Sequence, residues 1–286
     1  MTLHIGKIDY LNIWHVFELL AQTCPHGPDF HYVPGHPGEL NQALATGDLH
    51  LSPSSSFEYL LRAESYTLLP NASISAQKEV QSVLFLSPVP VEQLPLWLVQ
   101  NPGPVCLTNA SATSTALLKV LWSQKWNLAQ PQWQDVHPGQ GLSTGRPFLE
   151  IGNLALQHFI ERPPGYYIYD LATEWNMWTG LPFVFAVWIV RRNLNLEQSR
   201  LVARLAREIH TIILQLDRHF THLSTLSSRP PWLQAQDLIR YWQAMSYGLG
   251  PKEQAGLTLF GERCTQEGLL PGMPGLIWFS EEKYPL

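Results

Sequence analysis

The sequence predicts an α/β protein of two lobes, with the chain crossing twice between them. In each half of the chain a short apolar strand ends in hydroxyl side chains that open a helix, and such alternation is typical of sheets covered by helices. A proline-rich break at 88–95 and a nearly all-apolar strand at 183–190 mark the two crossings. We therefore expect lobe one at residues 1–90 and 183–286, and lobe two at residues 91–182.

The composition narrows the class of protein. A chain of 286 residues with 45% hydrophobic content can bury one large core or two moderate ones. Charged residues make up 14%, and the net charge is −5 with no Lys/Arg cluster, which argues against nucleic-acid binding. Cys24, Cys106 and Cys264 lack metal-ligand spacing and indicate structural thiols in a reducing compartment. Neither a signal peptide nor an apolar run of ~18 residues is found, so we expect a soluble cytoplasmic protein with no membrane partner.

The start of lobe one follows the alternating pattern. Hydrophobic spacing predicts strands at 3–8, 31–34 and 49–51 and helices at 13–20 and 37–45, the second ended by Gly47. Asn12 lies where the first strand meets the first helix. It is either a helix cap or a polar group aimed at a ligand over the carboxyl end of the strand. Ser82 begins the apolar strand at 82–86 and is either a solvated strand start or a ligand contact.

Ser55 and Ser56 stand at the first hydroxyl-rich junction. Ser55 with Glu58 three positions on reads as a capping box, so hydroxyls and the first free N–H groups of a helix would point at one place. Such a helix start favours a carboxylate or phosphate. An ordinary helix cap is the alternative interpretation.

Ser111, Thr113 and Ser114 form the second junction, after the strand at 105–107 and before a helix that runs to Trp126. The two junctions lie in different halves of the chain. Two anion sockets facing one another would suit a small molecule with two acidic groups.

The remaining elements complete the two lobes. A strand at 148–152 leads through Asn153, a helix cap or a ligand contact, into a helix at 154–161. Asp170 ends a strand at 166–170 and opens a helical turn. Three helices are then expected at 196–220, 234–247 and 251–267. Two lobes joined by two crossings, with a helical tail folded back on lobe one, form the plan of the type 2 periplasmic-binding-protein fold.

A set of short motifs between residues 3 and 190 resembles the chorismate dehydratase family of the futalosine route to menaquinone. In chain order the motifs are Tyr10-Leu11-Asn12, Ser55-Ser56-Phe57-Glu58-Tyr59, Leu69-Pro70, Ser73-Ile74-Ser75, Gln81 to Ser87, Ser111-Ala112-Thr113-Ser114, Ile151-Gly152 and Glu174 to Phe185. The sequence departs from the family at His15, often a proline, and at Asn153, commonly an Asp. The second departure leaves any acidic role at that position in doubt.

The resemblance implies dehydration of chorismate to 3-[(1-carboxyvinyl)oxy]benzoate without metal or organic cofactor. It implies that Asn12 and Ser82 position the enolpyruvyl group and the departing hydroxyl. The residues implied to hold the substrate's carboxylates are Ser55, Ser56, Ser111, Thr113, Ser114 and Asn153. No general-base constellation is evident, since His4, His15 and His50 lack spaced partners. In the family the substrate's own side-chain carboxylate takes the proton.

Two other functions remain open at this point. A sister enzyme of the same route, 1,4-dihydroxy-6-naphthoate synthase, cleaves a cyclic futalosine and shares the fold, but the motifs at 55–59 and 82–87 match the dehydratase pattern better. A non-catalytic solute-binding protein is the other alternative, because the fold also serves transporters. The missing export signal argues against it, and the missing acid/base pair argues for it. The sequence predicts no oligomeric state.

Overall fold

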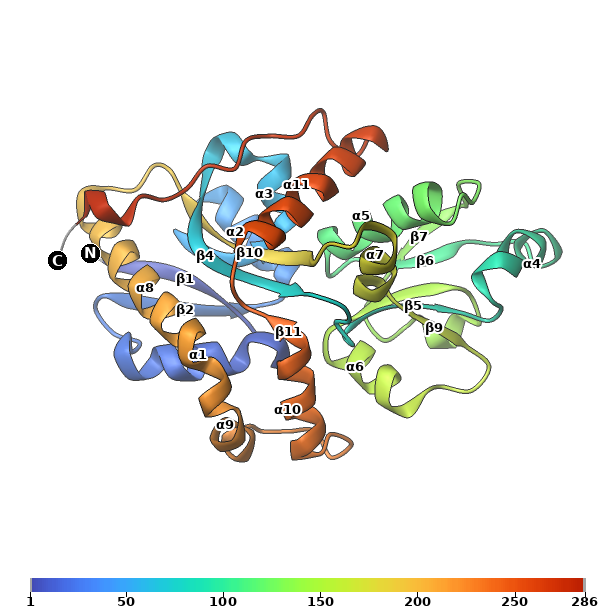
Figure 1. Cartoon of the computed structure of the whole chain (residues 1–286), viewed down its shortest axis with the longest axis horizontal. Coiled ribbons are helices and arrows are strands. Elements are labelled where there is room, and N and C mark those ends of the chain that lie inside the picture. The colour runs from blue at the N-terminus through green and yellow to red at the C-terminus, as the bar shows by residue number, and fades with distance from the viewer. Residues whose placement is uncertain (1, 285–286) are drawn as a thin grey trace.

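The computed structural model describes residues 2–284 and shows two α/β lobes side by side (Figure 1). The strands of the first sheet are β1 (Leu3–Ile8), β2 (Phe30–Gly35), β3 (Leu51–Ser55), β4 (Tyr66–Ala76), β10 (Phe183–Arg191) and β11 (Met245–Ser246). They are ordered β11-β4-β10-β3-β1-β2. β1 is parallel to β2 and β3, whereas β10 returns antiparallel between β3 and β4, so the sheet is mixed.

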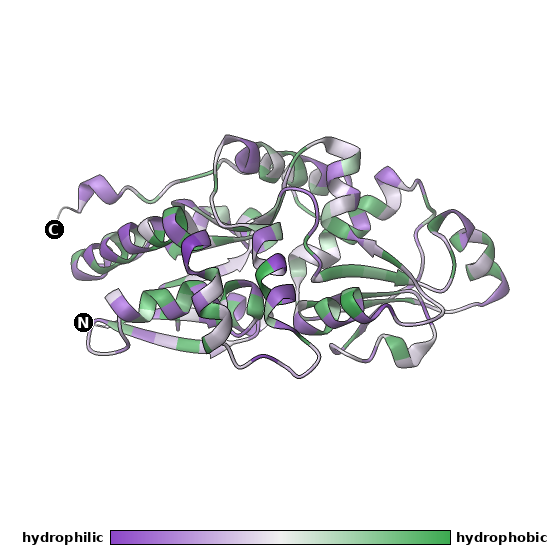
Figure 2. Cartoon of the chain, turned by 60° about the horizontal axis from the view of Figure 1, so that its bottom comes forward, coloured by the Kyte–Doolittle hydropathy of each residue, from purple (hydrophilic) through white to green (hydrophobic). Residues whose placement is uncertain are grey.

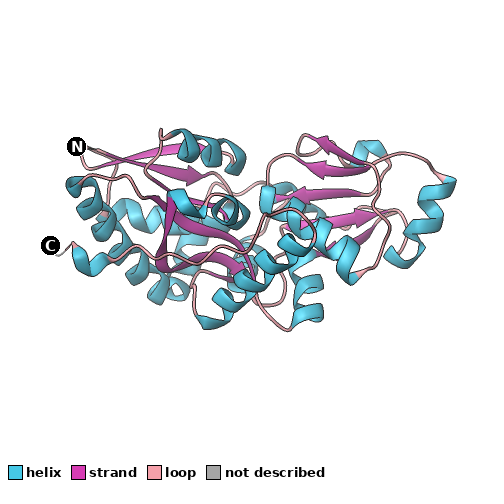
Figure 3. Cartoon of the chain, turned by 90° about the horizontal axis from the view of Figure 1, so that it is seen from above, coloured by secondary structure: helices cyan, strands magenta, loops and turns pink. Residues whose placement is uncertain are grey.

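The second sheet belongs to the smaller lobe. Its strands are β5 (Val83–Ser87), β6 (Val105–Thr108), β7 (Trp133–Val136), β8 (Phe148–Ile151) and β9 (Tyr167–Asp170), ordered β7-β6-β8-β5-β9. The helices of this lobe are α4 (Leu94–Gln100), α5 (Ala112–Val120), α6 (Gly152–Glu161) and α7 (Leu171–Thr179). Seen from above, each lobe has its own sheet with helices beside it (Figure 3).

The helices of lobe one come from both ends of the chain. They are α1 (Leu11–Thr23), α2 (Pro37–Thr46), α3 (Ser56–Leu61), α8 (Leu196–Gln215), α9 (Phe220–Leu226), α10 (Ala235–Ala244) and α11 (Pro251–Gln266). α8 packs on α1, and α11 contacts α3, β10 and α5 of lobe two, so α11 lies across the junction of the lobes (Figure 1). In Figure 2 the outer helices carry hydrophilic residues on one side, as expected for amphipathic helices on a sheet.

The first crossing lies earlier than expected. β4 belongs to the first sheet and β5 to the second, so the chain crosses between residues 76 and 83 and not at 90 and 91. The prolines that indicated the boundary follow β5 instead, and Pro95 lies in the first turn of α4, where a missing N–H costs nothing. The second crossing lies between residues 179 and 183.

Two element ends also differ from the sequence prediction. β3 does not end at Leu51 but continues through the serines to Ser55, because these side chains are buried between covered faces. The long helix ends at Gln215 and continues as a short 3₁₀ turn and α9, and residues 245–246 leave the next helix to pair with the edge of β4.

Burial matches the expected apolar positions. One buried cluster extends through both lobes, and a smaller one lies beneath α6, formed by Leu84, Leu86, Cys106, Phe148 and Ala155. All three cysteines are free and buried, as expected for structural thiols. Within residues 2–284, none of the helices has the length and apolar character that crossing a bilayer requires.

Candidate functional site

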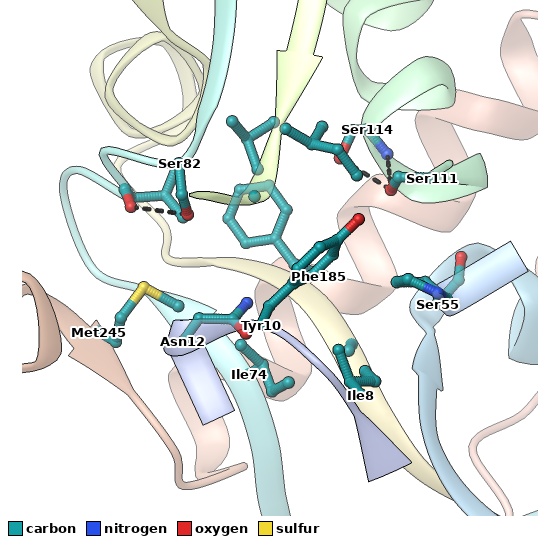
Figure 4. A pocket seen from close by; sticks show the side chains of 16 residues that line it. Ile8, Tyr10, Asn12, Ser55, Ile74, Ser82, Ser111, Ser114, Phe185 and Met245 are labelled. Carbon is teal, nitrogen blue, oxygen red and sulfur yellow. Dashed lines mark hydrogen bonds between the residues drawn. The ribbon is translucent and has the colours of Figure 1, made fainter. Parts of the chain in front are cut away.

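A cavity lies between the lobes and is lined by 16 residues from both of them (Figure 4). Five of the predicted site residues line it: Asn12, Ser55, Ser82, Ser111 and Ser114. Its other walls are mostly apolar and include Ile8, Ile74, Val80, Val83, Ile151, Phe185, Ala186 and Met245. Ligand sites typically combine such apolar walls with a few polar groups that fix orientation.

Five helices begin at the wall of this cavity. Tyr10, Ser55, Ser111 and Ile151 are the N-caps of α1, α3, α5 and α6, and Pro37 is the first residue of α2. The first N–H groups of a helix have no carbonyl partner within it, and its dipole makes this end positive. Of the described lining residues, only Tyr10 carries an ionisable side chain. The cavity therefore favours an anion through helix starts and hydroxyls.

The two hydroxyl-rich junctions meet at one end of the cavity. Ser55 Oγ and Thr113 Oγ1 are 2.5 Å apart, and Thr113 Oγ1 also accepts a hydrogen bond from Phe57 N–H at 3.2 Å. Ser111 caps α5 by accepting from Ser114 N–H at 3.2 Å. The sequence indicated two sockets facing one another, but the structure joins them into one, because α3 and α5 abut across the lobes.

Three predicted site residues lie outside the cavity lining. Ser56 is fully buried and donates to the Val184 carbonyl at 2.7 Å, so it fixes β10. Thr113 is buried and holds the lobes together behind Ser55. Asn153 lies beyond the cavity, where its Oδ1 accepts from Leu11 N–H at 3.3 Å. It is not the cap of α6, which is Ile151, and it connects the start of α1 with lobe two.

The predicted capping box at Ser55 forms only in part. Ser55 Oγ accepts from Glu58 N–H at 3.4 Å. The Glu58 carboxylate, however, binds Arg62 at 2.5 Å and the Tyr66 hydroxyl at 3.0 Å, and Ser55 N–H donates to Asn41. The carboxylate is held away from the cavity, which keeps a negative charge from the socket.

Asn12 and Ser82 lie together at the other end of the cavity, near Met245 (Figure 4). Asn12 is in the first turn of α1 but does not cap it, since Tyr10 is the N-cap. Its Oδ1 is buried and has no hydrogen-bond partner among residues 2–284. Such a group is costly to leave unpaired, so this oxygen is available to a hydrogen-bond donor of a ligand in the cavity. Ser82 Oγ donates to the Val80 carbonyl at 3.2 Å and accepts from Tyr241 at 2.8 Å.

Tyr10 forms the wall between the two ends. Its ring lies over Gly152, where an added Cβ would be 3.0 Å from the ring. Burial and the nearby charge of Glu150 raise the pKa of the Tyr10 hydroxyl to about 12, so it remains a hydrogen-bond donor. In Figure 4 this hydroxyl points toward the Ser111 end.

Asp170 fixes the first crossing just before Ser82. Its buried carboxylate accepts hydrogen bonds from Val80 N–H at 3.0 Å and Gln81 N–H at 2.6 Å. As predicted, it also opens α7, by accepting from Ala172 and Thr173 N–H. Burial raises the pKa of this carboxyl to about 6. The two residues before Ser82, Val80 and Gln81, are thus hydrogen-bonded to the N-cap of α7 in lobe two.

The three histidines considered as bases do not line the cavity. His15 is fully buried among the rings of Phe220, Trp242 and Tyr247, and burial lowers its pKa to about 3, so it is a neutral core residue. His50 accepts from His4 N–H at 2.9 Å, in the part of the sheet where β1 meets β3.

The segment from α10 to Tyr247 contributes to the site in a way that the sequence did not reveal. Met245 lines the cavity, and Tyr241 reaches Ser82. Trp242 Nε1 donates to the Leu11 carbonyl and the Tyr247 hydroxyl to the Asn12 carbonyl, both at 2.8 Å. Their spacing indicated only a buried helix face, and no local signal pairs them with residues 159 to 235 positions away.

A family model described as menaquinone biosynthesis matches residues 3–266. Chorismate dehydratase from Thermus thermophilus is 34% identical over 171 residues, covering 54% of this chain and 59% of that protein. The enzyme of the same name from Campylobacter jejuni is 31% identical over 185 residues, covering 63% of this chain and 64% of that protein. The chain thus spans less than two thirds of the length of these relatives.

Solved structures show the same architecture at low sequence identity. A protein from Archaeoglobus fulgidus has a TM-score of 0.69 at 15% identity, covering 94% of this chain and 98% of that chain. The alkanesulfonate-binding protein of Xanthomonas axonopodis pv. citri, bound to MOPS, has a TM-score of 0.66 at 14% identity, covering 97% and 96%. These likenesses concern the fold alone, and they confirm the predicted periplasmic-binding-protein-like architecture.

Proposed function

The chain belongs to the menaquinone biosynthesis family, and from this premise we propose that it is a chorismate dehydratase, a hydro-lyase that forms 3-[(1-carboxyvinyl)oxy]benzoate. The relatives at 34% and 31% identity bear this name. The observation that carries the proposal is a cavity with two polar ends, an apolar middle and five helix starts on its wall. Chorismate has the matching chemistry, since it carries one carboxylate on its cyclohexadiene ring and a second on its enolpyruvyl ether.

The two ends of the cavity would receive different parts of the substrate. Ser55, Ser111 and Ser114 surround the helix starts at one end and would hold the ring carboxylate by O–H and N–H donors. Asn12 and Ser82 would bind the enolpyruvyl group and the departing hydroxyl. The apolar walls between them would hold the ring flat and exclude water, which strengthens each of these polar contacts.

The reaction then needs little further chemistry from the protein. The ring carbon that bears the ether loses its proton, and the neighbouring carbon loses its hydroxyl group. None of the described lining residues carries a carboxylate or an imidazole. We therefore assign the proton transfer to the substrate's own enolpyruvyl carboxylate, from which the proton leaves with the hydroxyl as water. Aromatisation drives the step, and Asn12 and Ser82 stabilise the charge that develops.

Gly152→Ala is expected to weaken substrate binding through Tyr10. Gly152 has φ = 68°, and its new methyl group would stand 3.0 Å from the Tyr10 ring. We expect KM to rise about fivefold, in addition to a loss of roughly 1–2 kcal/mol in unfolding free energy from the left-handed backbone. Gly180→Ala is the matched control, because Gly180 has φ = 73° and nothing within 4 Å of an added Cβ. The Gly180→Ala variant should lose a similar amount of unfolding free energy while its KM stays unchanged. Equal KM values for the two variants would disprove the contribution of Tyr10 to substrate binding.

The proposed function is tested by incubating the purified protein with chorismate and recording the ultraviolet spectrum. We expect a new benzoate spectrum and one equivalent of 3-[(1-carboxyvinyl)oxy]benzoate by mass spectrometry, absent from a control without protein. Unchanged chorismate at high protein concentration would overturn the proposal. Parallel incubation with cyclic dehypoxanthinylfutalosine distinguishes the sister enzyme, and calorimetric binding without turnover distinguishes a solute-binding protein.

A further inference from the structure

Tyr241 lies directly behind Ser82, on a helix from the other end of the chain. It belongs to α10, is 1% exposed, and its hydroxyl is 2.8 Å from Ser82 Oγ. The two residues are 159 positions apart, so the tail of the chain reaches the polar end of the cavity at this contact. Tyr241 does not line the cavity itself.

The direction of this hydrogen bond determines what Ser82 can do. In the structure the Tyr241 hydroxyl donates a hydrogen bond to Ser82 Oγ. Burial raises the pKa of the Tyr241 hydroxyl above its usual range, so the phenol keeps the proton that this hydrogen bond requires. Ser82 Oγ must then direct its own hydrogen elsewhere. The Val80 carbonyl is 3.2 Å away, which is long for a bond between a hydroxyl and a carbonyl oxygen. The hydrogen can therefore turn from this long bond with Val80 to an oxygen atom of a ligand in the cavity, which Ser82 lines.

We propose that Tyr241 is a positioning residue that orients Ser82 as a hydrogen-bond donor to the substrate's departing hydroxyl. A hydroxyl that accepts one hydrogen bond becomes a better donor in the next, because successive bonds polarise one another. As the donor, Tyr241 also excludes the competing orientation in which Ser82 donates its hydrogen to Tyr241 and can only accept a hydrogen bond from the ligand. The inference rests on the proposed function, since it assigns a partner to one of the two residues placed at the reacting end.

A merely structural role for Tyr241 predicts a different outcome. Its ring packs among the buried side chains of the tail, and removing the hydroxyl alone leaves this packing in place. If the hydroxyl served only stability, its loss would lower the unfolding free energy and leave the kinetics unchanged. The kinetic effect of the hydroxyl should instead depend on Ser82.

The test is a double-mutant cycle with Tyr241→Phe, Ser82→Ala and the double variant. We expect Tyr241→Phe to lower kcat about tenfold with KM within about twofold, and Ser82→Ala to lower kcat about 100-fold. In the double variant kcat should equal that of Ser82→Ala, because Tyr241 then has no hydroxyl to orient. Tyr59→Phe is the matched control: Tyr59 is also fully buried, and its hydroxyl is hydrogen-bonded to Gly275 and Ile277 and not to Ser82. Any effect of Tyr59→Phe on kcat should multiply with that of Ser82→Ala.

An active wild-type protein whose Tyr241→Phe variant keeps full kcat would overturn the inference. A kcat of the double variant that is lowered by the product of the two single-variant effects would overturn the inference as well. Either result would leave the proposed function standing. A wild-type protein that does not convert chorismate would remove the proposed function and this inference together.

Discussion

Asn12→Ala is expected to lower kcat for chorismate about 100-fold while KM rises less than about threefold. The Asn12 side chain has a buried Oδ1 without a partner, and it lies beside Ser82 at the end of the cavity that we assign to the reacting atoms. Contacts that strengthen only as charge develops affect kcat more than substrate binding. Steady-state kinetics of chorismate conversion measure both constants.

Ser111→Ala is the matched comparison at the other end of the cavity. Ser111 caps α5 and lines the socket that we assign to the ring carboxylate, which bears charge before and during the reaction. Its loss should therefore raise KM about tenfold and change kcat less than about threefold. If Asn12→Ala changed mainly KM and Ser111→Ala mainly kcat, the two ends would have been assigned in reverse.

Asp170→Ala is expected to have the largest effect on stability, a loss of about 3 kcal/mol in unfolding free energy. The substitution removes the cap of α7 and leaves the N–H groups of Val80 and Gln81 buried without an acceptor. Because Gln81 has φ = 59° and directly precedes Ser82, the folded variant should also lose kcat. Denaturant unfolding and kinetics of the same sample measure the two effects.

Asp29→Ala is the control for this substitution. The Asp29 side chain is 54% exposed and pairs with Arg204, also exposed, at 3.1 Å. Exposed ion pairs contribute little to stability, so the unfolding free energy of this variant should fall by less than about 1 kcal/mol. Its activity should be unchanged. If Asp170→Ala were as stable as Asp29→Ala, the carboxylate would not be what holds the crossing in place.

Local patterns in the sequence predicted most of the lobes and much of the site. The run from Leu3 to Ile8 and the glycine at position 47 define a strand and a helix end without help from distant residues. Ser55 and Ser111 were found because a hydroxyl before an apolar helix face is a local signal. Asn12 and Ser82 were singled out because each stands at the end of a predicted element and belongs to one of the motifs that resemble the dehydratase family. All four line one cavity in the structure.

The rest depends on contacts between distant segments. Nothing local distinguishes Ser55, which lines the cavity, from Ser56, which turns toward Val184. Thr113 lies behind the cavity only because α3 and α5 abut. The Glu58 carboxylate turns to Arg62 and Tyr66, which a three-residue capping pattern does not contain.

The first crossing was misplaced for a related reason. Proline marks a change of direction but does not say which sheet the preceding strand joins. The pairing of β5 with β8 and β9 decides this, and it involves residues 62 to 86 positions further along the chain. Tyr241 was missed in the same way, because its partner Ser82 is 159 positions away.

A crystal structure of the Asn12→Ala variant with chorismate tests the central claim most directly, since this slow variant should retain its substrate. We predict that chorismate lies in the cavity between the lobes, with one carboxylate at Ser55, Ser111 and Ser114 and the hydroxyl beside Ser82. A second cavity, lined by Arg191, Arg192 and Lys283, offers a dianion positive side chains instead of helix starts. Chorismate bound there, with the cavity between the lobes empty, would contradict the account.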